Sequence, residues 1–210
     1  MWFESCCLLV HRLEFLIQKK NKHAPSVVNG KELAVVNSAK ILGITLSNDL
    51  KWNFHVNETI KKANKRLYFL VLLKRAGVSC NDIINFYCTV IRPVLEYCSP
   101  IFHHSLPDYL SDDLERVQKR ALSIIAPEKS YKHSLDSFSL RTLRDRRNEQ
   151  CVKLFNSISS DQHKLACLLP PKHYGHYNIR HERVFDLPRF CTNRFKQSFI
   201  PAMCRRANAN

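Results

Sequence analysis

Histidine and cysteine side chains are concentrated near the end of the chain, where they could bind a metal ion. The candidates are His173, His176, His181, Cys191 and Cys204. Structural zinc sites normally use two pairs of ligands, with two to four residues between the members of a pair. Only His173 and His176 have such a spacing, and no Cys-x-x-Cys motif occurs. We therefore expect no metal site, and the lack of glycine-rich phosphate-binding motifs predicts no bound cofactor.

The same C-terminal segment is basic and aromatic, a combination that can bind nucleic acid. Between residues 171 and 210, eight Lys and Arg residues stand against two acidic residues, a net charge of +6. The aromatic residues among these charges are Tyr174, Tyr177, Phe185, Phe190, Phe195 and Phe199. Cations attract phosphates and rings stack on unpaired bases, so the mixture suits a single strand. Alternatively, the rings pack against the rest of the protein and the charges are merely solvated.

The whole chain is also strongly basic. Its 210 residues include 33 Lys and Arg against 18 Asp and Glu, a formal net charge of +15. Such a surface field attracts polyanions, of which nucleic acid is the commonest. The nine cysteines, an odd number without a secretory signal, predict reduced thiols in a cytoplasmic or nuclear protein. Residues 1–22 are apolar but interrupted by charges, which predicts an amphipathic helix or a poorly packed leader rather than a secretory signal or a membrane-spanning helix. We expect no membrane partner.

Short β elements are expected before the helices. Asn29-Gly30 lies between β-branched residues in the segment 26–33, and this pair readily forms a type I′ hairpin turn. The apolar run 39–46, rich in branched side chains, has the length and composition of a single strand. The first ordered part of the chain is therefore predicted to be a small β-hairpin unit.

Helical periodicity predominates from residue 53 onward. Residues 53–76 carry an apolar stripe on one helical face, formed by Val56, Ile60, Ala63, Leu67 and Leu70. Asn53 is the expected N-cap and Gly77 the expected stop. Further helices are predicted from Ser79 to about residue 95, with a kink or an interruption at Pro93, then from Ser111 to residue 126, and over about 140–158. The expected fold is mainly α: a small β-hairpin, a bundle of three or four helices and an irregular basic tail.

Several stretches of the chain also resemble, in the same order, segments in the sequences of one protein family. The first are Lys40-Ile-Leu-Gly-Ile-Thr-Leu46, Asp49-Leu-Lys-Trp-Asn53 and Lys62-Ala-Asn-Lys-Arg-Leu-Tyr-Phe-Leu70. Ile91-Arg-Pro-Val-Leu-Glu-Tyr-Cys98 and Leu114-Glu-Arg-Val-Gln-Lys-Arg-Ala-Leu122 follow. Together they resemble the end of the palm and the thumb of jockey-like non-LTR retrotransposon reverse transcriptases. The resemblance covers about residues 24–201, whereas residues 1–23 do not fit it.

The resemblance implies a way of binding nucleic acid. Leu42 and Gly43 would belong to a hairpin that steadies the 3′ end of the primer, and the helices after it would grip an RNA–DNA duplex by its backbone. The cations expected to touch phosphates are Lys61, Lys62, Lys65, Arg66, Lys74, Arg75, Arg116, Lys119, Arg120, Arg180, Arg183, Arg194 and Lys196. The alternative for the helical cations is a solvated helix face.

The catalytic part of such an enzyme is not expected in this chain. Its reaction uses carboxylates that hold two metal ions, and the family's signature is an aromatic residue, one spacer and two Asp. The nearest string, Tyr109-Leu-Ser-Asp112-Asp113, has one residue too many and follows the thumb-like helices. We interpret Asp112 and Asp113 as acids at the start of a helix, where their negative charge interacts favourably with the positive end of the helix dipole. We expect no enzymatic activity.

The sequence therefore predicts four segments. They are an atypical leader (1–23), a palm-end β-hairpin (24–50), a helical thumb-like domain (51–160) and a basic aromatic tail (161–210). The predicted function is non-catalytic binding of an RNA–DNA hybrid or a single strand, with an intact retroelement polymerase as a further candidate partner. The alternative is a transposon-derived product without a selected function, or one recruited as a protein-interaction module.

Overall fold

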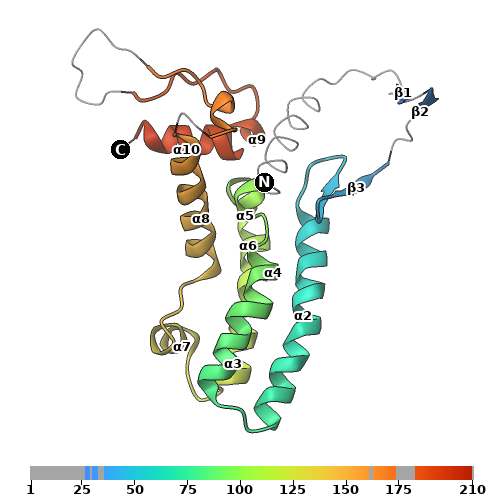
Figure 1. Cartoon of the computed structure of the whole chain (residues 1–210), viewed down its shortest axis with the longest axis vertical. Coiled ribbons are helices and arrows are strands. Elements are labelled where there is room, and N and C mark those ends of the chain that lie inside the picture. The colour runs from blue at the N-terminus through green and yellow to red at the C-terminus, as the bar shows by residue number, and fades with distance from the viewer. Residues whose placement is uncertain (1–26, 29, 33–35, 161–162, 174–182, 210) are drawn as a thin grey trace.

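Helices make up most of the described chain and run lengthwise through an elongated molecule (Figure 1). The structure is a computed structural model, and it describes residues 27–28, 30–32, 36–160, 163–173 and 183–209. The β-hairpins and the C-terminal segment lie at one end, and the turn that follows the long helix of residues 53–75 lies at the other. The predicted mainly α class is confirmed. The predicted leader, residues 1–23, lies outside the described residues.

Two hairpins precede the helices, where the sequence predicted one hairpin and one strand. β1 (Val27–Val28) pairs antiparallel with β2 (Lys31–Glu32), as Asn29-Gly30 predicts. The run 39–46 is not a single strand, because β3 (Ser38–Ile41) turns back into β4 (Ile44–Ser47). Leu42 and Gly43 both have positive φ, 49° and 85°, which the tight turn requires. Apolar residues on both arms of this hairpin gave the sequence the pattern of one longer strand.

The long helix α2 (Asn53–Arg75) is bounded as predicted at one end only. Its N-cap is Trp52 rather than Asn53, and no side chain caps it. At the other end Gly77 adopts φ +73°. The Gly77 amide donates to the Lys74 carbonyl and the Val78 amide to the Leu73 carbonyl, which is the Schellman arrangement.

The second predicted helix is interrupted near its proline, as expected. Ser79 caps α3 (Cys80–Phe86) by accepting a hydrogen bond from the Asp82 amide. A π-helical turn (Tyr87–Ile91) then leads into α4 (Arg92–Glu96), which carries Pro93 in its first turn. Proline has no amide hydrogen to donate, so the irregular turn falls where the regular pattern cannot continue. The short α5 (Ser99–Phe102) and a 3₁₀ turn (His103–Ser105) follow and were not predicted.

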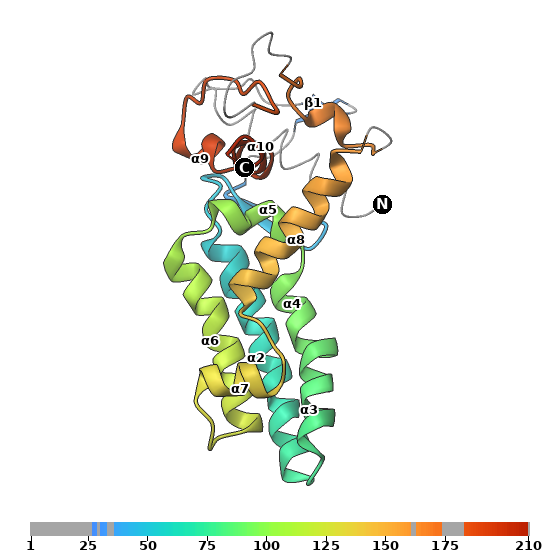
Figure 2. The same ribbon diagram turned by 90° about the vertical axis from the view of Figure 1, so that its left-hand side faces the viewer.

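The remaining bundle helices begin at other residues than the sequence predicted. α6 (Asp108–Ile125) starts three residues before Ser111, directly after Pro107, so Asp112 and Asp113 lie in its second turn. α8 (Leu143–Ile158) starts after residue 140, because the Thr142 side chain caps it. A short helix that the sequence analysis missed, α7 (Tyr131–Ser137), lies between them beside α6 (Figure 2).

Two hydrophobic clusters hold these elements together. The bundle core joins β4, α2, the segment from α3 to α4, α6 and the start of α8, and includes Ile44, Leu70 and Leu114. The tail core joins the second half of α8 to the C-terminal segment and includes Cys151 and Met203. As far as Thr192 the described tail is irregular, apart from a 3₁₀ turn (Ala166–Leu168) and a single antiparallel bridge between Lys172 and Phe185. It is not irregular throughout, because it ends in two helices that were not predicted, α9 (Asn193–Lys196) and α10 (Phe199–Ala207).

Candidate nucleic-acid interface

α2 has one buried and one exposed face, and the exposed face is basic and aromatic. The predicted stripe is largely buried, with Ala63 and Leu70 fully covered and Ile60 partly exposed. Lys61, Lys62, Lys65 and Arg75 are all exposed and form no ion pair with a described residue. Aromatic and aliphatic side chains on the same side of the helix are also exposed, namely Phe54, Tyr68, Phe69 and Leu72. We call these eight residues the outer face of α2.

The aromatic part of this face was missed by the sequence analysis. Phe54 is 61% exposed, Tyr68 60% and Phe69 52%, values far above those of core aromatic residues. A signal was available, because a period of 3.6 residues places all three away from the stripe that contains Ala63. Large apolar side chains at such positions cannot reach the core of the bundle. They are accessible to a binding partner instead.

Two of the predicted phosphate ligands on α2 have structural contacts instead. The Lys74 ammonium donates to the carbonyl oxygen of Ile125, the last residue of α6, at 2.8 Å. It thereby compensates the negative end of that helix. The Arg66 guanidinium donates to the Val90 carbonyl oxygen within the π-helical turn. Both cations connect α2 to a neighbouring segment and are therefore poor candidates for the interface.

The predicted cations on α6 are partly engaged as well. Arg116 pairs with Asp113 one turn away, on the exposed side of the helix. Lys119 lies over the ring of Tyr131, 5.3 Å from its centroid, in a cation–π contact. Arg120 is exposed and has no hydrogen bond or ion pair to a described residue. All three remain at the surface, so they can contribute charge to an interface although two of them have local partners.

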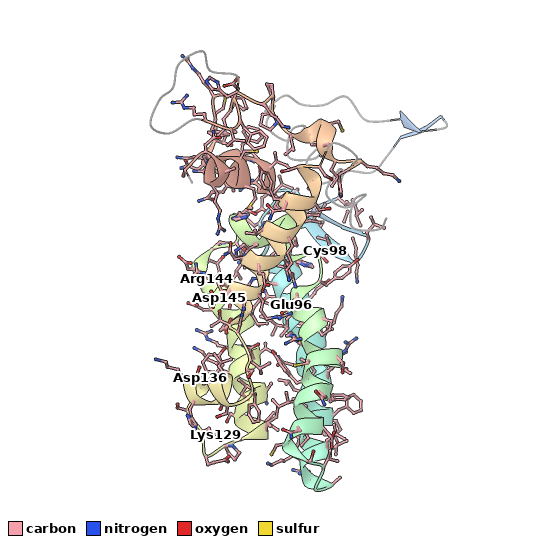
Figure 3. All side chains as sticks on the ribbon, turned by 60° about the vertical axis from the view of Figure 1, so that its left-hand side comes forward. Glu96, Cys98, Lys129, Asp136, Arg144 and Asp145 are labelled. Atoms are coloured by element: carbon pink, nitrogen blue, oxygen red, sulfur yellow. The ribbon has the colours of Figure 1, made fainter. Side chains whose placement is uncertain are left out.

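Basic residues of α8 hold the bundle together rather than facing a partner. Arg146 forms a two-pronged ion pair with the buried Glu96 of α4, which raises the pKa of the guanidinium. Arg144 pairs with Asp108 at the start of α6. The guanidinium of Arg147 is completely buried and donates to the Ser111 hydroxyl at 2.7 Å. Figure 3 shows the labelled Glu96 and Arg144 at the junctions that α8 makes with the bundle.

In the tail, the described aromatic side chains pack inward. Phe185 is 4% exposed and meets Phe155 of α8 edge to face, with ring centroids 6.0 Å apart. Phe199 is buried, and Phe190 lies against Phe195 with centroids 5.8 Å apart. These contacts agree with the alternative in which the rings pack on the protein. Tyr174 and Tyr177 lie outside the described residues.

The predicted cations of the tail differ in their surroundings. Arg183 and Lys196 are exposed. Arg194 donates to the Asp49 carbonyl oxygen at 2.6 Å, which connects α9 to the segment after β4. Arg180 lies outside the described residues. The tail therefore offers isolated cations, whereas α2 offers a row of them.

The predicted primer-grip residues form the turn between β3 and β4. The Leu42 carbonyl oxygen accepts a hydrogen bond from the Tyr97 hydroxyl at 2.8 Å. A Cβ atom added at Gly43 would lie 3.2 Å from the ring of the same tyrosine, so the turn packs closely on the end of α4. The turn is thus fixed to the bundle, and Gly43 is exposed.

The described residues offer no grouping for a metal ion. No three His, Cys, Asp or Glu side chains among them are arranged to hold one. His173 instead contacts Asp186 at 2.6 Å, and Cys204 is buried in the tail core, where burial raises the pKa of its thiol to about 12. His176 and His181 lie outside the described residues. Asp112 is exposed, and its neighbour Asp113 faces Arg116.

Burial also keeps two histidines near the junction of α2 with α5 uncharged. Removal from water lowers the pKa of His55 to about 4 and that of His103 to about 3. His55 is enclosed by the rings of Trp52 and Phe102. Both side chains are therefore neutral at pH 7, and they add no charge to the interface.

A pocket of about 460 Å³ opens between α4 and α8, beside Glu96. The cations in its wall are Arg92, Arg146 and Lys153. Glu96 faces both arginines, and Lys153 pairs with Glu149. This pocket is lined by neutralised charges, so it is a weaker candidate for an anionic ligand than the outer face of α2.

Comparison of the chain with protein-family models, curated proteins and solved structures found no match. The resemblance to retrotransposon reverse transcriptases therefore stays a prediction from the sequence. None of the helices in the described part of the chain is long and apolar enough to cross a membrane.

Proposed function

We propose that this chain binds nucleic acid through the phosphate backbone and has no catalytic activity of its own. The outer face of α2 supports the proposal most directly. Its four cations extend from Lys61 to Arg75, about 21 Å along the helix axis at 1.5 Å per residue. Unpaired cations in such a row suit a regular polyanion, because each can neutralise one phosphate without breaking an internal contact.

The resemblance of residues 24–201 supports a more specific form of this proposal. The chain would be the thumb and tail of a retroelement RNA-directed DNA polymerase, without the carboxylates of the palm. Its ligand would be an RNA–DNA hybrid or a single strand, and an intact retroelement polymerase is a further candidate partner. A cytoplasmic or nuclear location is consistent with the odd number of cysteines.

Salt titration of binding tests the proposal. If all four cations of the outer face neutralise phosphates, the logarithm of the affinity falls with the logarithm of salt with a slope of about −3.6. Raising the salt from about 50 to 200 mM then weakens binding to an RNA–DNA hybrid by about 150-fold. Fluorescence anisotropy of a labelled hybrid measures this slope. Absence of binding at the lower salt concentration would contradict the proposal and favour the alternative of a protein-interaction module.

A matched pair of variants assigns the slope to α2. The first replaces Lys61, Lys62, Lys65 and Arg75 with Gln. The control removes the same charge from exposed positions elsewhere, by replacing Lys132, Lys164, Lys172 and Arg189 with Gln. We expect the first variant to lose most of the salt dependence and the control to keep it. An equal loss in both would mean that net charge, rather than the face, drives binding.

The absence of catalysis is tested separately by primer extension. We expect the purified chain to add no nucleotides to a primed RNA template with either Mg²⁺ or Mn²⁺. Extension that persists after contaminating polymerases are removed would show that this part of the proposal is wrong.

A further inference from the structure

The arrangement of side chains along the outer face of α2 indicates which form of nucleic acid it fits. Phe54 and Leu72 are five helical turns apart, so they lie on one line along the helix, about 27 Å from end to end. Lys61 and Lys65 lie between them, within about 20° of the same line at 100° per residue. Tyr68 and Phe69 flank the line and contact each other, with ring centroids 6.1 Å apart.

This arrangement is unlike a protein-docking face. The core of a protein interface is apolar and depleted in lysine, with charges at the rim. Here Lys61 and Lys65 occupy the middle of the face and the apolar residues lie at its ends and sides. A protein partner without carboxylates at matching positions would have to bury two ammonium groups that form no ion pair with a described residue, at a large cost in solvation. Phosphates, by contrast, supply the opposite charge at the middle of the face.

The exposed rings separate a single strand from a duplex. In a duplex the bases are paired and stacked on one another, so a protein reaches mainly the backbone and the base edges. A single strand can turn its bases outward onto aromatic side chains. The lysines can bind the phosphates of both forms, whereas the ring faces of Tyr68, Phe69 and Phe54 can stack only on unpaired bases.

We propose that the outer face of α2 binds single-stranded nucleic acid, with bases stacked on Tyr68, Phe69 and Phe54 and phosphates on Lys61 and Lys65. This inference rests on the proposed function and adds the class of ligand. The lysines supply affinity that depends on salt, and the rings supply affinity that does not. The two contributions are therefore separable by experiment.

The test compares the full chain with Y68A/F69A, measured against a labelled single-stranded oligonucleotide and a labelled RNA–DNA hybrid. Stacking on a base contributes about 1–3 kcal/mol by alanine substitution, so single-strand affinity should fall at least fivefold for each ring that stacks. Affinity for the hybrid should change less than twofold. The salt slope for the single strand should stay the same, because no cation is removed. Circular dichroism checks that the variant keeps its helical content.

V184A is the control, since Val184 is an exposed apolar residue of the tail, 44% exposed, and lies outside α2. It should leave single-strand affinity unchanged. A second readout is the fluorescence of 2-aminopurine in the oligonucleotide, which stacking on Tyr68 or Phe69 quenches in the wild-type chain and not in Y68A/F69A.

The outcomes distinguish this inference from the function on which it rests. If the wild type binds both ligands and Y68A/F69A loses affinity for both equally, or for neither, the stacking inference is wrong and backbone binding stands. If the wild type binds neither ligand at low salt, both fail. If sedimentation shows the free wild-type chain to be a dimer that Y68A/F69A dissociates, the face is a self-association surface and the inference is overturned.

Discussion

A buried glutamine joins three parts of the bundle, and its replacement should have a large and specific effect. Gln118 of α6 is 1% exposed. Its Oε1 atom accepts a hydrogen bond from the Tyr87 hydroxyl at 2.6 Å. Its Nε2 atom donates to the Tyr131 hydroxyl at 2.9 Å and to the Arg141 carbonyl oxygen at 3.0 Å. One side chain thus connects α6 to the π-helical turn, to α7 and to the segment before α8.

Gln118→Leu keeps the size of the side chain but removes these three hydrogen bonds, together with a longer one from Nε2 to the Glu115 carboxylate at 3.4 Å. The Tyr87 hydroxyl, which is fully buried, loses its acceptor, and an unsatisfied buried group costs about 1–3 kcal/mol. The two lost bonds from Nε2 add about 1 kcal/mol in total, since Tyr131 also hydrogen-bonds to Glu115. We expect the free energy of unfolding to fall by about 3 kcal/mol. Urea denaturation followed by circular dichroism measures it.

A double-mutant cycle checks the reasoning behind that magnitude. Tyr87→Phe alone should cost about 1 kcal/mol, because Gln118 keeps its two donor bonds. In the double variant no buried hydroxyl is left without an acceptor, so the total loss should be no larger than that of Gln118→Leu alone. The coupling energy should therefore be about 1–2 kcal/mol. Losses that simply add, or a loss below about 1 kcal/mol for Gln118→Leu, would refute the assignment of stability to this network.

Three further predictions concern the turn, the α2–α6 contact and pH. Gly43→Ala should lower the free energy of unfolding by about 2 kcal/mol, because φ is +85° and the new Cβ would meet a tyrosine ring at 3.2 Å. Gly77→Ala, where φ is +73° and nothing lies within 4 Å, should cost only about 1 kcal/mol in the same urea assay. Lys74→Met should lower stability by about 1 kcal/mol and leave nucleic-acid affinity unchanged, whereas reduced affinity would return Lys74 to the interface. Because the pKa of His55 is lowered from 6.5 to about 4, the unfolded chain takes up a proton there before the folded chain does. The part of the free energy of unfolding that comes from His55 should therefore be fully present above about pH 6.5 and fall by up to about 3 kcal/mol toward pH 4, with His103 acting in the same direction. If His55→Gln left the curve unchanged, His55 would be excluded as a cause.

Periodicity and capping rules predicted the parts of the fold that depend on local physics. The buried stripe of α2, the helix start at Ser79, the stop at Gly77 and the interruption near Pro93 follow from residue types within one or two turns of helix. The β prediction was wrong where one local pattern is compatible with two structures. An apolar run of eight residues suits one strand or two short arms, and only the positive φ at Leu42 and Gly43 distinguishes them.

The candidate site was predictable in composition but not in detail. Charge and spacing identified Lys61, Lys62 and Lys65 correctly as exposed residues. The contacts of Lys74 and Arg66 could not be predicted, because the carbonyl oxygens that they contact belong to segments distant along the chain. Such contacts depend on how helices pack, and backbone acceptors carry no signature in a sequence.

One consequence of the two hydrophobic clusters concerns α8. Leu143 at the start of this helix belongs to the bundle core, while Cys151 and Ile158 belong to the tail core. Local opening of a protein follows such clusters, so the latter half of α8 and α10 should exchange their amide hydrogens together, independently of the bundle. A protease that cuts after Ile158 would expose the latter half of α8 and leave its first half packed in the bundle core. The boundary between the two cooperative units would then lie within a single continuous helix.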